Sequence, residues 1–261
     1  MAHDTPLETI FITGGGRGIG RAIALDLTKT TNTSLVLVSR TDTCRTVAAE
    51  CNAIRVGAAR GMTCDLSVAG AQRDELYAAI EAAKGPIGIV HAASTLGPTG
   101  PFVDVAIDDC WKAIETNLGA TIRLVHAAVP RMAREQAGRL VLFGGGGAAY
   151  GYPNFMSYAL TKVALVRFVE TLAMELGQDG PSVTIIAPGA NDTDMLAEVR
   201  RAGGIVKTTV SIDEPCRLVR RLLLEDARGL HGRFVHVRDT WTSESARELS
   251  TDHWKLRRIE S

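Results

Sequence analysis

The chain has 261 residues, of which 46% are hydrophobic and 22% are charged, an ordinary globular composition that can bury a sizeable core. Basic and acidic residues both number 29, so no net charge favours nucleic acid or an anionic membrane as a partner. The polar N-terminus, the absence of a long apolar run and five cysteines without CxxC spacing predict a cytoplasmic protein with no membrane partner, disulfide framework or metal site.

Short apolar runs alternate with segments of helical period along the chain. The predicted strands are Thr9–Ile12, Ser34–Ser39, Gly61–Cys64, Ile87–Ala92, Arg139–Phe143, Ser182–Ala187 and Arg233–Val237. The predicted helices include Gly18–Thr28, Asp74–Ala83, Asp108–Met132, Ser157–Leu176 and Glu214–Leu224. Strands that are apolar on both faces and followed by helices indicate a parallel sheet covered on both sides. We therefore predict one α/β domain over residues 1–261, a doubly wound Rossmann fold with a seven-stranded parallel sheet and helices on both faces.

Two segments interrupt this alternation. Residues 191–209 lie between a strand and a helix and are predicted to form a mobile flap over the substrate. Their charged side chains, Lys207 among them, fit a polar substrate and a solvated lid helix equally well. Residues 240–261 form a polar tail with two tryptophans, which we expect to pack on the body or on a neighbouring subunit.

The first predicted strand leads directly into the glycine-rich turn Thr13–Gly20, and the turn leads into the first helix. Glycine lets the chain turn tightly and lets a pyrophosphate approach its backbone, while the helix N-terminus offers free N–H groups to the phosphates. A glycine cluster alone is weak evidence, because Gly144–Gly147 is also a glycine cluster. The strand before and the helix after, at the first crossover of the chain, make Thr13–Gly20 a dinucleotide-binding signature. The predicted contacts are Gly14, Gly16, Arg17, Gly18, Ile19 and Gly20.

The residues after the second strand indicate which dinucleotide binds. A site for NAD places a carboxylate there to bind the adenosine ribose, whereas Ser39, Arg40 and Thr41 include no acid. Arg17 approaches the same position from the glycine turn, and two guanidinium groups with two hydroxyls suit a 2′-phosphate. We therefore predict NADP(H). Asp65, after the third strand, is expected near the adenine or as an N-cap of the next helix.

Tyr158 has a lysine four residues later, Lys162, and this spacing puts both side chains on one face of a helix. An ammonium group beside a phenol favours the phenolate, so we expect Lys162 to lower the pKa of Tyr158 and to make it a general acid/base. The pair opens the helix after the fifth strand, at the edge of the sheet where α/β folds bind ligands.

With these motifs, nearly the whole chain resembles the short-chain dehydrogenase/reductase family, especially its short, ketoacyl-reductase-like members. The matching stretches are Thr13–Gly20, Asp65-Leu66, Thr116-Asn117-Leu118, Tyr158–Lys162, Pro188-Gly189 and Thr193-Asp194-Met195. The resemblance implies that Tyr158 is the general acid/base, that Lys162 binds the nicotinamide ribose and tunes the tyrosine, and that Asn117 supports a water-linked proton path. It also implies cofactor contacts from Asp65, Leu66, Ala92, Pro188, Gly189 and Thr193, and a homodimer or homotetramer.

Two positions depart from the family pattern. The segment His91-Ala92-Ala93-Ser94 stands where the family has Asn-Asn-Ala-Gly, and Gly145 stands where the family has a serine that donates a hydrogen bond to the substrate carbonyl. Loss of such a donor costs about a hundred- to a thousandfold in rate in comparable sites. Candidate substitutes are Tyr150, Tyr152, Asn154, Ser157 and Ser94. The glycine run also predicts open space for a bulky polyhydroxylated substrate near Tyr158.

These observations predict an NADPH-dependent ketoreductase, or alcohol dehydrogenase in the reverse direction, acting on the carbonyl or hydroxyl of a small molecule. One alternative is a dehydratase or epimerase that works through a transient keto intermediate. A second alternative is a non-catalytic NADP-binding regulator, which the glycine at position 145 favours and the retention of Tyr158, Lys162 and Asn117 disfavours.

Overall fold

The computed structural model describes residues 6–206 and 208–257. Lys207 of the predicted flap and residues 258–261 of the predicted tail therefore lie outside the described residues. Seven strands form one parallel sheet in the order β3-β2-β1-β4-β5-β6-β7, as predicted for a doubly wound fold. The strands are β1 (Thr9–Thr13), β2 (Ser34–Ser39), β3 (Ala59–Thr63), β4 (Ile87–His91), β5 (Arg139–Phe143), β6 (Ser182–Ala187) and β7 (Phe234–His236).

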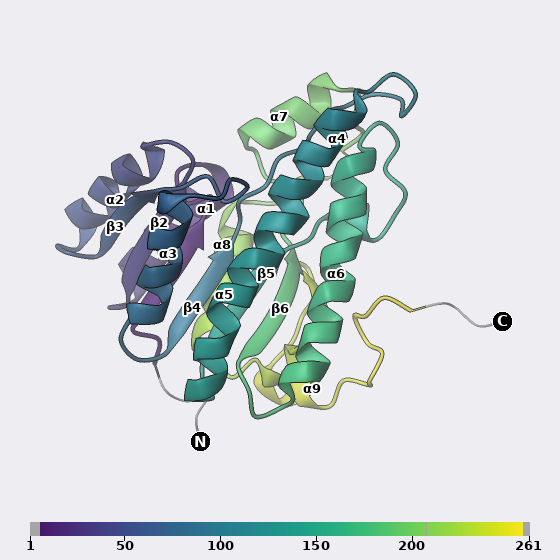
Figure 1. The fold of residues 1–261 in the computed structure, drawn as a ribbon. Helices are drawn as coiled ribbons and strands as arrows, with labels where there is room; N and C mark the ends of the chain where they lie inside the picture. The colour runs from purple at the N-terminus through teal and green to yellow at the C-terminus, as the bar shows by residue number, and fades with distance from the viewer. Residues whose placement is uncertain (1–5, 207, 258–261) are drawn as a thin grey trace.

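Helices cover both faces of the sheet, as Figure 1 shows. One face packs on α1 (Gly18–Thr30), α2 (Thr43–Ile54) and α8 (Asp213–Leu224). The other face packs on α3 (Ala71–Ala82), α5 (Ala120–Glu135) and α6 (Met156–Leu176). The central strands β4 and β5 are buried along their whole length, because parallel strands between two helical layers have no solvent-facing side.

The helix predicted as one piece over Asp108–Met132 is divided into three. It consists of α4 (Ile107–Ile114), a π-helical turn over Glu115–Gly119 and α5. The period of the apolar residues runs through all three pieces, so the sequence pattern did not reveal the extra residue in the turn. A π-turn places one residue more per turn and frequently marks a functional site. Here it contains the buried Asn117.

The flap holds a short helix, α7 (Asp194–Arg201), at the same end of the molecule as α4 (Figure 1). Its N-cap is Thr193, whose hydroxyl accepts a hydrogen bond from the Leu196 N–H. At the flap base, the Val210 N–H donates to the Ala190 carbonyl, and the Asn191 side chain donates to the carbonyl of Val210. The two ends of the flap are therefore fastened together.

The C-terminal tail, with α9 (Ser243–Arg247), packs on the body of the domain. The buried Arg233 donates to the carbonyls of Ser250 and His253, and the Phe234 N–H of edge strand β7 donates to the Trp254 carbonyl. Over residues 6–206 and 208–257, no helix is long and apolar enough to cross a membrane, and no group of three metal-ligating side chains is present.

Candidate active site

One cleft brings together segments that are far apart in the sequence. It is lined by the glycine turn, the ends of β2, β3 and β4, the start of α6, and the flap. Most of the predicted site residues line it: Gly14, Gly16, Arg17, Gly18, Ile19, Gly20, Ser39, Arg40, Asp65, Leu66, Ala92, Tyr158, Lys162, Pro188 and Thr193. Asn117 and Gly189 are not among the lining residues. Gly189 has a φ of +69° and faces Val210 of the flap base, and Asn117 lies buried behind the loop after β4.

The glycines of the first turn are required by space and by backbone conformation. Gly14 has a φ of +70°, and a Cβ there would lie 2.7 Å from the Ala93 backbone nitrogen. A Cβ at Gly20 would collide with the Gly14 carbonyl, so the turn could not close onto α1. No side chain caps the N-terminus of α1. The turn therefore has the shape and the free N–H groups that a pyrophosphate needs.

The tip of β2 carries hydroxyl and guanidinium groups and no carboxylate on the cleft. Arg40 is exposed and makes no ion pair within the described part of the chain. The hydroxyl of Ser39 donates to the Thr41 carbonyl at 2.6 Å and accepts from the Cys44 N–H, so it already anchors α2. Thr43, which the sequence analysis did not single out, also lines the cleft, with its Oγ1 3.0 Å from that of Thr41.

Arg17 and Asp65 have partners on the cleft wall. Arg17 Nη1 lies 3.5 Å from the Asp194 carboxylate at the start of α7, and both side chains are largely exposed. Asp65 Oδ1 accepts from the N–H and the hydroxyl of Ser67, at 2.9 and 2.6 Å. Asp65 is not the N-cap of the next helix, because α3 begins at Ala71 with Gly70 before it. That alternative is therefore wrong, and Asp65 instead closes a turn on the cleft.

Tyr158 and Lys162 lie on one face of α6, as their spacing predicts, but their pKa values do not follow the expectation. Burial raises the pKa of Tyr158 to about 12, and nearby Tyr152 adds to this rise. Burial also lowers the pKa of Lys162 to about 8. The prediction that Lys162 lowers the tyrosine pKa was wrong for this structure, because burial determines the shift and Lys162 does not contribute to it. Lys162 Nζ donates to the Phe143 carbonyl at 2.9 Å and lies 5.4 Å from the centre of the phenol ring.

Asn117 joins the loop after β4 to the helix that carries Tyr158. Its Oδ1 accepts from the Thr95 N–H at 2.9 Å and from the Ser94 hydroxyl at 3.1 Å. Its Nδ2 donates to the Thr95 carbonyl at 2.8 Å and to Thr161 Oγ1 at 3.3 Å. All the polar atoms of this buried amide are therefore bonded, which holds one wall of the cleft in a fixed position.

Three of the four glycines in the second run are required by close contacts. A Cβ at Gly144 would lie 2.7 Å from the Phe234 ring, and one at Gly147 would lie 3.0 Å from the Ala159 Cα. Gly145 has a φ of +153°, and a Cβ there would lie 3.0 Å from the Tyr158 hydroxyl oxygen. Gly146 alone has open space around it. The tyrosine hydroxyl thus occupies much of the space that the sequence analysis assigned to the substrate.

Of the five candidate substitutes for a serine, only Ser94 lines the cleft. Its hydroxyl donates to Asn117. Tyr150 is 79% exposed, and Tyr152 stacks on Phe155 with ring centroids 4.5 Å apart. The buried Ser157 lies near Gly97, and its hydroxyl has no hydrogen-bond partner among residues 6–206 and 208–257.

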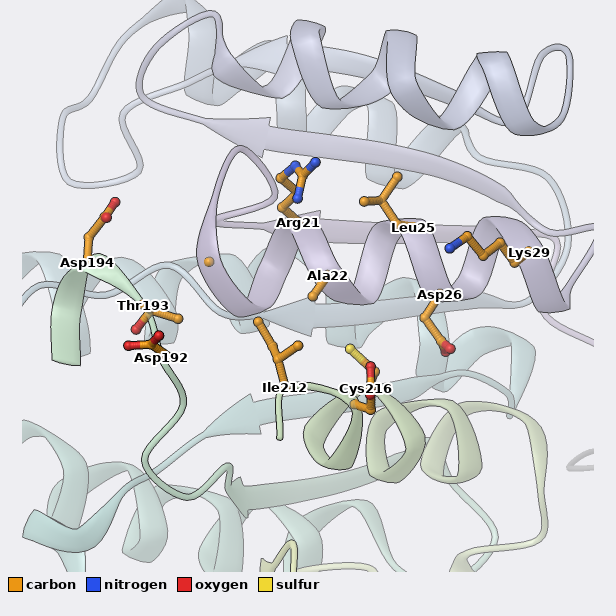
Figure 2. A pocket seen from close by; sticks show the side chains of 12 residues that line it. Arg21, Ala22, Leu25, Asp26, Lys29, Asp192, Thr193, Asp194, Ile212 and Cys216 are labelled. Carbon is orange, nitrogen blue, oxygen red and sulfur yellow. The ribbon is translucent and has the colours of Figure 1, made fainter. Parts of the chain in front are cut away.

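A second hollow adjoins the cleft behind the glycine turn, between α1, α8 and the segment before α7 (Figure 2). It shares Gly18, Thr193 and Asp194 with the cleft, and neither Tyr158 nor Lys162 lines it. Asp26, on its wall, is bound by Arg220 at 2.6 and 2.9 Å. This hollow therefore lies outside the candidate reaction site.

Comparison with known proteins identifies the family to which this chain belongs. A family model described as short chain dehydrogenase matches residues 8–203. The chain belongs to the short-chain dehydrogenase family. The short-chain reductase protein NovJ of Streptomyces niveus is 36% identical over 198 residues, which cover 74% of this chain and 73% of that protein. The 3-oxoacyl-(acyl-carrier-protein) reductase FabG of Aggregatibacter actinomycetemcomitans is 32% identical over 193 residues, covering 73% of this chain and 79% of that one.

Solved structures of short-chain dehydrogenases have the same fold. One from Salmonella enterica serovar Typhi superposes with a TM-score of 0.81 at 24% identity, covering 92% of this chain and 99% of that one. Another, from Shigella flexneri in complex with NADP, has a TM-score of 0.81 at 23% identity and covers 92% and 100% of the two chains. The recognition of the family and of its Rossmann-type fold from the sequence is thereby confirmed, and the chain is a member of an oxidoreductase family.

Proposed function

We propose that this short-chain dehydrogenase is an NADPH-dependent ketoreductase. The observation that carries the proposal is the position of Tyr158 and Lys162 in the same cleft as the glycine turn. A dinucleotide held at the turn would share this cleft with the pair, because the glycines of the turn and the side chains of Tyr158 and Lys162 all line it. The reductases among the relatives, NovJ and FabG, support this class of reaction.

The residues of the chain suit the proton-donating half of a carbonyl reduction. A reduced nicotinamide cofactor, when bound, would supply the hydride for the ketone carbon. The Tyr158 hydroxyl gives its proton to the ketone oxygen, and a pKa of about 12 keeps that proton in place at neutral pH. Lys162 carries its charge below a pH of about 8 and stabilises negative charge that develops on the phenol and on the substrate oxygen.

The phosphate-bearing form of the cofactor is favoured by the charges at the end of β2. Arg40 is exposed and unpaired among the described residues, and Arg17 has only an exposed carboxylate at 3.5 Å as its partner. Asp42, the first acid after the strand, is engaged with Thr63 and Arg45 and does not line the cleft. The complex of the Shigella protein with NADP is consistent with this choice.

The wall beside Tyr158 favours an apolar substituent on the substrate ketone. Leu96, Tyr158 and Met195 line the cleft here. They belong to an apolar cluster with Phe155 and Val199, which are buried and do not line the cleft. Desolvation of a polyhydroxylated substituent on this wall would be costly, whereas an aryl or alkyl group gains from burial. The sequence analysis left the polarity of the ketone open. This wall supports ketones with apolar substituents over polyhydroxylated ones.

The test is NADPH oxidation by the purified protein with a panel of aryl, alkyl and polyhydroxylated ketones. We expect turnover of aryl or alkyl ketones, and a loss of about a hundredfold or more in Tyr158→Phe. Tyr150→Phe is the matched control, because Tyr150 is exposed and does not line the cleft.

Other outcomes would contradict the proposal in distinct ways. Tight NADPH binding with no turnover of any carbonyl, and no effect of Tyr158→Phe, would identify a binding protein. Loss of water or inversion of a centre without net NADPH consumption would identify a dehydratase or epimerase.

A further inference from the structure

The buried His91 occupies a position between two threonine hydroxyls at the centre of the fold. His91 ends β4 and is paired in register with Thr13, the last residue of β1 and the first of the glycine turn. Its Nδ1 lies 2.6 Å from Thr13 Oγ1, and its Nε2 lies 2.7 Å from Thr121 Oγ1 on α5. All three side chains are at most 3% exposed, so both ring nitrogens are shielded from bulk solvent.

The Asn117 backbone carbonyl, which bonds to Thr121, determines the position of each proton in this series of hydrogen bonds. Thr121 Oγ1 lies 2.6 Å from the Asn117 backbone carbonyl, which can only accept, so the threonine hydroxyl donates its single proton there. Thr121 must then accept from His91, which places a proton on Nε2. Nδ1 is left as an acceptor for the Thr13 hydroxyl. The direction of donation thus runs from Thr13 to His91 to Thr121 to Asn117.

A neutral imidazole is required for this arrangement, since a doubly protonated ring could not accept from Thr13. Burial lowers the pKa of His91 to about 3, and the positive charge of Lys162 contributes to the lowering. The ring therefore remains neutral over the working range of an enzyme and adds no charge beside Lys162.

We propose that His91 is a positioning residue, which in its Nε2–H tautomer connects the glycine turn to the Asn117 carbonyl. In this role it holds the π-turn and α6, the helix of Tyr158 and Lys162, in a fixed position relative to the glycine turn. The side chain of Asn117 continues the connection to Thr161, whose hydroxyl donates to the Tyr158 carbonyl. The glycine turn, the π-turn and α6 are thereby connected by hydrogen bonds that meet at Asn117, through its backbone carbonyl on one side and its side-chain amide on the other. A histidine suits this position because its two ring nitrogens reach opposite partners, one as acceptor and one as donor.

The tautomer can be read without any substrate by NMR of protein with 15N-labelled histidine. We expect His91 to show a protonated Nε2 and an unprotonated Nδ1 throughout pH 6 to 8. Thr121→Val, which removes the acceptor, should change the His91 nitrogen signals. An Nδ1–H tautomer or a charged ring in this pH range would overturn the proposal, whatever the reaction that the enzyme catalyses.

The functional arm compares Thr121→Val with Thr121→Ser in the NADPH-dependent assay. We expect kcat to fall about tenfold or more in Thr121→Val, with KM changed far less, and to be largely restored in Thr121→Ser, which keeps the hydroxyl. Thr28→Val is the control, because Thr28 is a buried threonine that donates to the Ala24 carbonyl four residues earlier in the same way. It lies on α1, which packs on the other face of the sheet from α6. Equal losses in Thr28→Val and Thr121→Val, or an unchanged kcat in Thr121→Val, would contradict a positioning role.

Discussion

Restoring the serine that the family pattern places at position 145 is expected to harm this enzyme. Gly145 has φ +153° and ψ 176°, a region that only glycine adopts without strain. A side chain there would also begin 3.0 Å from the Tyr158 hydroxyl oxygen. Gly145→Ser must therefore either move the backbone of the glycine run or push the tyrosine aside.

The magnitude follows from these two effects. A non-glycine residue in this region costs about 1–3 kcal/mol, which lowers the Tm of a domain of this size by about 2 to 10 °C. Displacement of the Tyr158 oxygen by about an ångström misaligns the proton donor, and such a shift costs on the order of a hundredfold in rate. The hydrogen bond that the new hydroxyl offers would not offset both losses.

The assay is kcat/KM for NADPH-dependent ketone reduction together with the thermal unfolding midpoint. Gly146→Ser is the matched control, since Gly146 is exposed, has open space around it and has no positive φ. We expect Gly146→Ser to leave the Tm and kcat/KM nearly unchanged and Gly145→Ser to lower both. A Gly145→Ser variant that is faster than the wild type at an unchanged Tm would refute this reasoning and show an impaired form of the usual site.

Two further predictions concern charges in the cleft. In the folded protein the pKa of Lys162 is about 8, below its ordinary value of 10.5, so the stability cost of charging it is fully present below pH 8 and disappears as the pH rises to about 10.5. Lys162→Met should therefore raise the Tm at pH 7 but not at pH 10.5. The same variant should lower kcat about a hundredfold or more. An unchanged Tm at pH 7 would contradict the stability cost assigned to the buried charge. Arg40→Ala should weaken NADPH binding about tenfold and leave NADH binding unchanged in titration calorimetry. Arg45→Ala is its control, because Arg45 pairs with Asp42 and does not line the cleft. Equal weakening for both cofactors would argue against a 2′-phosphate contact.

Much of the architecture could be predicted from the sequence because it depends on local patterns. The apolar runs at Ser34–Ser39, Arg139–Phe143 and Ser182–Ala187 coincide with β2, β5 and β6, since buried parallel strands are apolar without interruption. The glycine turn and the Tyr158–Lys162 pair are likewise local, so the cleft that they line was foreseeable. The π-turn around Asn117 was not, because it adds one residue to a helix whose apolar pattern continues through it.

What the sequence determined by itself is therefore the family, the sheet and the identity of the main candidate residues. The tertiary structure decided how those residues behave. Packing around α6 desolvates Tyr158 and Lys162 and moves their pKa values apart, against the expectation from spacing alone. Packing also gives Gly145 its positive φ beside the tyrosine hydroxyl. It places His91 between Thr13 and Thr121, which are far apart in the sequence. Burial and contacts between distant segments set these properties, and neither is written in any local pattern of residues.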